Sequence, residues 1–178
     1  MNPLRFFLGQ QLVPGLINAA LNGGIAWAQH GQAPRVGLWD SGAYAVDLLA
    51  TGFLLPAISW TILRPLLLRQ QSQGKAPDLE DLRVPRLLPW MPSSLWRGSL
   101  AVGLLGMTLM GGSCLLLALA LGQPGFTGPD YALLKAVYAG LLTIALQPLM
   151  VFAALHSAPA SAQSDIGRST PLQDTNRP

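Results

Sequence analysis

Long runs without a formal charge dominate the hydrophobic and polar pattern of the chain. Three of them are 29, 32 and 29 residues long, and they occupy residues 6–34, 98–129 and 136–164. Each exceeds the roughly 20 residues that cross the hydrocarbon core of a bilayer as a helix. A fourth run, at 48–63, has 16 residues and is shorter unless Asp47 enters the membrane interface.

This pattern predicts an all-α membrane protein built as a bundle of four transmembrane helices. The runs are rich in Leu, Ala and Gly and lack the period-two alternation of barrel strands. Helices are then the structure that satisfies the backbone groups in lipid. The predicted spans lie at about 4–28, 43–63, 95–121 and 131–155.

The connections predict how these helices are arranged. Residues 29–42 join the first two spans and residues 122–130 join the last two, so each pair is expected to form an antiparallel hairpin of neighbouring helices. The Pro-rich connector at 64–94 either lies in the lipid headgroup layer or is a solvated linker with a few anchors. The polar segment 157–178 is expected to be a disordered cytoplasmic tail, outside a transmembrane domain at 1–156.

Basic residues predict the orientation. With the N-terminus inside, nine of the eleven Lys and Arg residues lie on the inner side, and only Arg35 and Lys135 lie outside. In a bacterial host, the positive-inside rule therefore predicts that both termini are cytoplasmic. The alternative is a signal peptide cleaved after the small-x-small sequence at 26–28. The preceding run is too long for a signal peptide, and Gln and Asn residues interrupt it.

Composition supports lipid as the main partner. Charged residues make up 11% of the chain, compared with about 25% in soluble domains. The mean hydropathy is +0.39 and the pI is near 9.5. The basic residues sit at the ends of apolar runs and do not form a stripe interleaved with aromatic residues, so a membrane surface is expected as their partner and nucleic acid is not.

Three carboxamides form a candidate polar face in the first span. Gln11, Asn18 and Asn22 are spaced by seven and four residues, which places them on one side of a helix. The structural interpretation is hydrogen bonding between helices, worth about 0.6 to 2 kcal/mol per contact. The functional interpretation is the lining of a substrate path. We favour the structural one because no ionisable group joins this face.

Asp47 and Lys135 form a candidate charge pair. Each lies about one turn inside its span, both at the outer end in the predicted orientation. An acid and a base at equal depth offset each other's desolvation, whereas either alone is costly in lipid. We therefore expect a structural pair or snorkelling of the two side chains to the interface, with a role in an ion pathway or in substrate binding as the alternative.

Small residues recur three or four positions apart in three of the predicted spans, which lets helix backbones approach closely. They include Gly15, Ala19 and Gly23; Ser99, Gly103 and Gly106; and Ala132, Ala136 and Gly140. Packing within the bundle is the expected explanation, and association of two copies of the chain is the alternative.

The chain lacks a catalytic constellation. His30 and His156 are expected on opposite sides of the membrane, and Cys114 is the single cysteine. The sequence has no Walker loop, no His-Glu-x-x-His and no Gly-x-Ser-x-Gly. We therefore predict a non-enzyme with no cofactor and no metal site.

Two stretches resemble an uncharacterised family of small bacterial four-span integral membrane proteins. The first is 39–65, with DLLATGFLLP at 47–56 and Arg-Pro at 64–65, and the second is KAVYAGLL at 135–142 followed by Pro148. The resemblance covers most of residues 1–156. It implies a bacterial inner-membrane setting and no particular activity.

Two functional hypotheses follow. The first is a non-enzymatic membrane component of unknown biochemical activity that acts through helix–helix association, with itself or with a membrane protein partner. The alternative is a small permease or channel built as a homo-oligomer. Matching Thr-Pro spacings at Thr51/Pro56 and Thr143/Pro148, which suggest a duplicated hairpin, favour this alternative.

Overall fold

The computed structural model describes residues 3–39, 42–73 and 94–156, and this part of the chain is mostly helical. The helices are α1 (Pro3–His30), α2 (Tyr44–Ser72), α3 (Leu95–Gly106), the π-helix η2 (Met107–Gly112), α4 (Ser113–Ala120) and α5 (Gly128–His156). Two short strands, β1 (Val36–Gly37) and β2 (Gly125–Phe126), complete the fold. The predictions for the greater part of the connector and for the tail lie outside the described residues.

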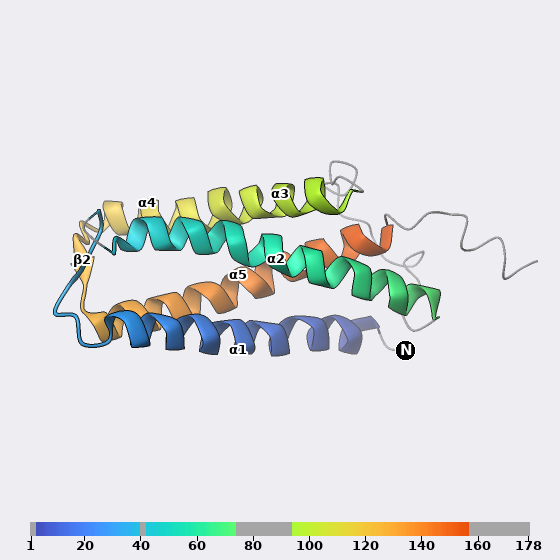
Figure 1. Ribbon diagram of the computed structural model, residues 1–178, viewed down its shortest axis with the longest axis horizontal. Helices are drawn as coiled ribbons and strands as arrows, with labels where there is room; N and C mark the ends of the chain where they lie inside the picture. The colour runs from blue at the N-terminus through green and yellow to red at the C-terminus, as the bar shows by residue number, and fades with distance from the viewer. Residues whose placement is uncertain (1–2, 40–41, 74–93, 157–178) are drawn as a thin grey trace, which may run out of the picture.

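The helices lie along one common axis, and successive helices run in opposite directions (Figure 1). α3, η2 and α4 follow one another as a single rod. The loops that join α1 to α2 and α4 to α5 meet at one end of the molecule, where β1 pairs antiparallel with β2 and Val36 lies opposite Phe126. The N-terminus of α1 and the C-terminal end of α5 lie at the opposite end of the molecule.

Three helical segments are long and apolar enough to cross a membrane. They are α2, the rod from Leu95 to Ala120, and α5 from Gly128 to Leu155. These segments identify a multi-pass membrane protein. At 28 residues α1 is also long enough, but it is not among the three, because its Gln and Asn residues make it less apolar.

Two helices differ in detail from their predicted spans. α2 continues to Ser72, so the predicted connector begins as a helix. The charge of Arg64 ends an apolar run, but Arg and Leu are good helix formers and the helix continues beyond it. The third span contains the six-residue π-helix η2, which ends at Gly111 and Gly112.

Helix packing differs from the two predicted hairpins. The most extensive contacts join α1 to α5, followed by those of α2 with α3 and with α5. α1 and α2, although joined by a short loop, are not among the extensively packed pairs. A short loop sets helix direction, whereas the matching of small-residue faces decides which helices approach closely.

The contact between α1 and α5 depends on glycine. A Cβ atom added at Gly23 would lie 2.6 Å from the Cβ atom of Ala136, and one added at Gly15 would lie 2.8 Å from Cγ1 of Ile144. Gly140 faces Ala19 in the same way. The small-residue faces of these two helices therefore pack against each other within one chain.

The contact between α2 and α3 combines a glycine pair with side-chain hydrogen bonds. Pro56 has no N–H, so the Gly52 carbonyl loses its usual helical donor, and Gly106 packs directly against that carbonyl. The Ser99 hydroxyl donates to the Ala57 carbonyl at 2.9 Å. The Trp60 indole, which is fully buried, donates to the Leu95 carbonyl at 3.1 Å.

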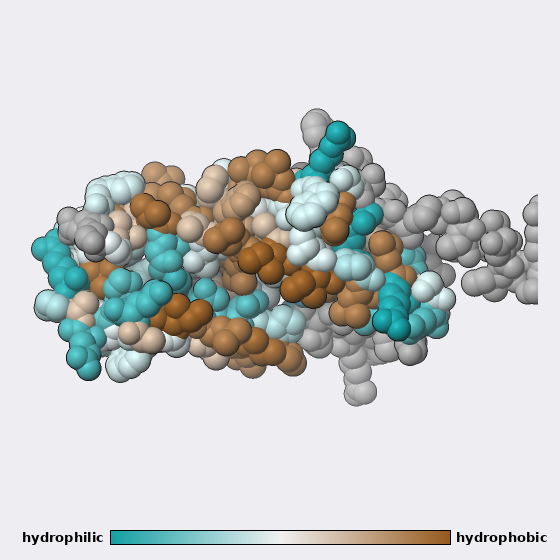
Figure 2. Space-filling model, in the orientation of Figure 1, coloured by the Kyte–Doolittle hydropathy of each residue, from teal (hydrophilic) through white to brown (hydrophobic). Residues whose placement is uncertain are grey.

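The outer surface of the helices is apolar. Leu16, Leu116 and Leu133 are each about two-thirds exposed. Figure 2 shows hydrophobic side chains gathered over the middle of one face, with hydrophilic side chains toward its ends. An apolar girdle of this kind is typical of a surface that faces lipid acyl chains.

A pair of adjacent glycines tests the α1–α5 contact. Gly23→Ala is expected to lower the stability of the folded protein in detergent by about 1–3 kcal/mol, because its methyl group would overlap Ala136. Gly24→Ala is the matched control, since an added Cβ there meets no atom within 4 Å. Thermal unfolding of both variants measures the difference, and equal stability of the two would contradict the close α1–α5 approach.

Candidate functional site

A partly buried ion pair joins the loop ends of α2 and α5. Asp47 lies in the first turn of α2, and Lys135 lies in the second turn of α5. The Lys135 ammonium donates to both carboxylate oxygens of Asp47. The Lys135 side chain is 6% exposed and that of Asp47 is 31% exposed, so the lysine is the more deeply buried partner. The structure thus brings the two residues of the candidate charge pair together.

Tyr131 is a third member of this site. It lies one helical turn before Lys135, and its hydroxyl also donates to Asp47. The Tyr131 ring is fully buried and meets the His30 ring edge-on at a centroid distance of 5.6 Å. The sequence contains a signal for this role, because residues four apart on a helix share one face.

Neighbouring tyrosines connect the site to the loops and to α2. The Tyr44 hydroxyl donates to the Gln123 carbonyl at 2.8 Å, and the Tyr44 ring meets the Phe126 ring edge-on at 5.1 Å. The Tyr138 hydroxyl donates to the Leu48 carbonyl at 3.0 Å. These contacts fix the first turns of α2 against α5 and β2.

The carboxamide face of α1 is directed mainly at α5. Asn18 donates to the Thr143 hydroxyl at 2.9 Å, and that hydroxyl in turn donates to the Ala139 carbonyl at 2.9 Å. Asn22 donates to the Asn18 carbonyl at 3.0 Å within its own helix. Gln11 is half-buried and has no hydrogen bond with another described residue. Thr143, which is 4% exposed, was not predicted as the partner of Asn18.

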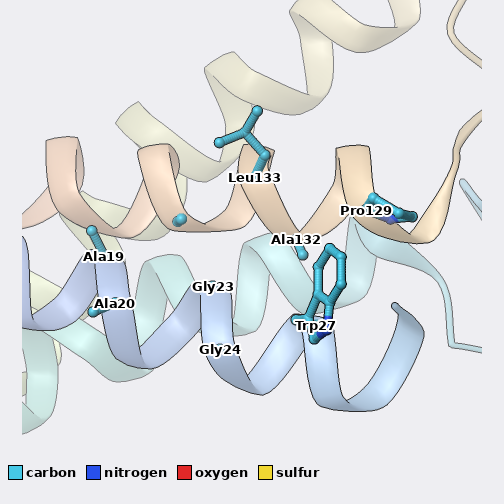
Figure 3. A pocket seen from close by; sticks show the side chains of 9 residues that line it. Ala19, Ala20, Gly23, Gly24, Trp27, Pro129, Ala132 and Leu133 are labelled. Carbon is cyan, nitrogen blue, oxygen red and sulfur yellow. The ribbon is translucent and has the colours of Figure 1, made fainter. Parts of the chain in front are cut away.

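An apolar groove of about 390 Å³ runs between α1 and α5, separate from these polar groups. In Figure 3 the Trp27 ring from α1 stands near Pro129 of α5, while Gly23 and Gly24 leave the α1 backbone bare. The groove is lined by Ala19, Ala20, Gly23, Gly24, Trp27, Pro129, Ala132, Leu133 and Ala136. None of these side chains carries a charge, so the groove suits an apolar occupant.

The polar groups of this site bind one another across the helices. Within the described ranges, no group of three His, Cys, Asp or Glu residues is placed to hold a metal ion. Cys114 is half-buried on α4 and is a free thiol. The charges of Asp47 and Lys135 neutralise each other, and the groups around them are phenols that already act as hydrogen-bond donors.

No family model, curated protein or solved structure matches the chain. The resemblance to small four-span bacterial membrane proteins therefore stays a prediction.

The ion pair is tested by a double-mutant cycle. Asp47→Asn and Lys135→Met are each expected to lower stability by about 2–3 kcal/mol. This is somewhat less than the loss for a fully buried pair, because Asp47 is 31% exposed. The double variant is expected to lose less than the sum of the two. Thermal unfolding in detergent measures the coupling, and strictly additive losses would refute a direct interaction.

Proposed function

We propose that the chain is a four-span integral protein of a bacterial inner membrane with both termini in the cytoplasm. α1 is then the fourth span, inserted with its polar face against α5 and its apolar face toward lipid. The hydrogen bond from Asn18 to Thr143 supports this arrangement, because it satisfies a carboxamide that lipid would leave unpaired. The orientation rests on the excess of Lys and Arg on the inner side.

Within this membrane setting, we propose a non-enzymatic component that acts through helix–helix association. The observation that carries the proposal is that polar side chains of different helices bond to one another. Asp47 of α2 binds Lys135 and Tyr131 of α5, and Asn18 of α1 binds Thr143 of α5. Such pairs hold the helices together, and their polar groups are already bonded within the protein. The alternative permease needs Asn18 and Asn22 to face a water-filled path, and both are already engaged as donors, Asn18 toward α5 and Asn22 within α1.

The glycine faces of α1 and α5 are not available for association with another chain. Gly15, Gly23 and Gly140 already pack against the facing helix of the same chain. The exposed apolar residues of α1 and α4, such as Leu16 and Leu116, are free of close packing against other helices and are the surfaces offered to the bilayer. An association partner would therefore contact side chains of this kind.

Reporter fusions test the four-span topology. A fluorescent protein fused after Pro178 is expected to be fluorescent, because the C-terminus is cytoplasmic. Alkaline phosphatase inserted after Gly31 is expected to be active, because that loop is outside the membrane. Three spans with a cytoplasmic C-terminus place residue 31 outside even if α1 does not insert, so a fluorescent protein fused before Met1 decides this point. It is expected to be fluorescent, and a dark fusion before Met1 together with a fluorescent C-terminal fusion would contradict insertion of α1.

A single-cysteine variant separates association from transport. In a Cys114→Ser background, Asn18→Cys is expected to resist a membrane-impermeant thiol reagent, since position 18 packs against α5. Gln32→Cys, in the exposed loop after α1, is the reactive control. Rapid labelling of the cysteine at position 18 in sealed vesicles would favour the permease.

A further inference from the structure

The apolar groove between α1 and α5 is nearly as long as one leaflet of a bilayer is thick. On α1 it extends from Ala19 to Trp27, which corresponds to about 12 Å of helix. The hydrocarbon core of a bilayer is about 30 Å thick, so one leaflet contributes about 15 Å. The groove lies toward the loop ends of both helices, and none of its lining residues carries a charge. Its length and chemistry therefore suit part of one hydrocarbon chain.

Small residues of α1 keep this groove open. Gly23 brings the α1 backbone against Ala136, and both residues line the groove. Gly24 also lines it, and a Cβ atom added at Gly24 would meet no atom within 4 Å. Ala20, one turn earlier, is exposed. A large side chain at position 24 would therefore extend into the groove without displacing the helices.

A polar pocket of about 500 Å³ lies beyond the groove, at the end of α1. None of its lining residues carries a charge, and its polar groups are the Gln29 and Gln32 carboxamides and the last carbonyls of α1. The carbonyl end of a helix has a partial negative charge. The pocket therefore favours a group that donates hydrogen bonds and is positively charged. It is lined by Trp27, Ala28, Gln29, Gly31, Gln32 and Ala33.

Trp27 connects the groove with the polar pocket, because it lines both. In Figure 3 its ring stands near Pro129, at the end of the groove. The same ring lies close to Gly31 in the pocket, since a Cβ atom added at Gly31 would be 3.3 Å from two ring carbons. Trp27 is 59% exposed, and exposed indoles concentrate at the headgroup level of a bilayer. The groove and the pocket therefore meet where the hydrocarbon chain of a lipid joins its headgroup.

We propose that the groove and the pocket together bind one phospholipid whose headgroup ends in a primary ammonium, as in phosphatidylethanolamine. One acyl chain lies in the groove, and the ammonium donates to the carboxamides and the helix-end carbonyls of the pocket. A helix from a second copy of the chain fits less well, because it is about 10–12 Å across and would leave the polar pocket unused. This inference rests on the proposed function in one respect, since α1 must lie in the bilayer.

Native mass spectrometry of the full chain in detergent tests the site, with equimolar phosphatidylethanolamine and phosphatidylcholine as probes. The two lipids carry the same acyl chains and the same net charge, but the choline headgroup has no N–H donor. The wild-type protein is expected to retain about tenfold more phosphatidylethanolamine, because hydrogen bonds to a charged group are among the stronger ones. Equal retention of the two lipids would overturn the proposal.

Two variants test the two parts of the site. Gly24→Leu is expected to lower retention of phosphatidylethanolamine about tenfold, because its side chain extends into the groove. Ala145→Leu is the matched control, since Ala145 is exposed on α5 outside the groove. Gln29→Leu combined with Gln32→Leu is expected to remove the preference between the two lipids. Unchanged retention by Gly24→Leu would overturn the site. A wild-type dimer that Gly24→Leu dissociates would also overturn it, in favour of a second copy of the chain.

Failure of this site is distinguishable from failure of the four-span topology. The fluorescent protein fused before Met1 reports insertion of α1 and does not depend on bound lipid. If that fusion is fluorescent and Gly24→Leu retains as much phosphatidylethanolamine as the wild type, the lipid site alone is overturned. If that fusion is dark while the C-terminal fusion is fluorescent, the four-span proposal fails, and the lipid site fails with it because the groove does not face acyl chains.

Discussion

The structure depends on one constraint: polar groups between the helices must find hydrogen-bonding or ionic partners, because lipid supplies none. In a low-dielectric interior an unpaired charge is more costly than a paired one, and lipid offers no hydrogen bonds. Asp47 and Lys135 satisfy this constraint for each other, with Tyr131 as a further donor. Because the three residues come from α2 and α5, their pairing also fixes the relative depth of these helices.

α5 is the helix through which the rest of the bundle is connected. It packs extensively against α1 and α2, and more lightly against α3. Toward α1 it presents Ala136 and Gly140, which permit close backbone approach, and Thr143, which accepts from Asn18. The less apolar α1 therefore has a polar and closely packed face toward protein and an apolar face outside. Both faces are needed for a helix of its composition to lie in lipid.

The sequence was sufficient for the helical class and for the approximate limits of the helices, because charges are excluded from apolar runs. It also indicated the contact of Asp47 with Lys135, since equal depth was deducible from the positions of both residues in their spans. The partner of Asn18 could not be deduced in this way. Thr143 becomes its partner only because α1 packs on α5, and loop lengths alone favoured packing of α1 on α2.

Two other features, the π-helix η2 and the full length of α2, could not be predicted from the hydrophobic pattern. Apolar periodicity does not distinguish an α-helical turn from a π-helical one, so η2 had no signal except the adjacent Gly111 and Gly112. The length of α2 past Arg64 was also hidden, because a charge marks the edge of lipid and not the end of a helix.

The central claim is that lipid surrounds α1 as it surrounds the other helices. The most direct measurement places a spin label at Leu16→Cys in a Cys114→Ser background, reconstitutes the protein in liposomes, and compares collisions with oxygen and with a water-soluble nickel chelate. Leu16 is 70% exposed on the outer face of α1, so the label replaces no packed contact. The account predicts frequent collisions with oxygen, which concentrates in the bilayer, and few with nickel. Frequent collisions with nickel and few with oxygen would contradict it.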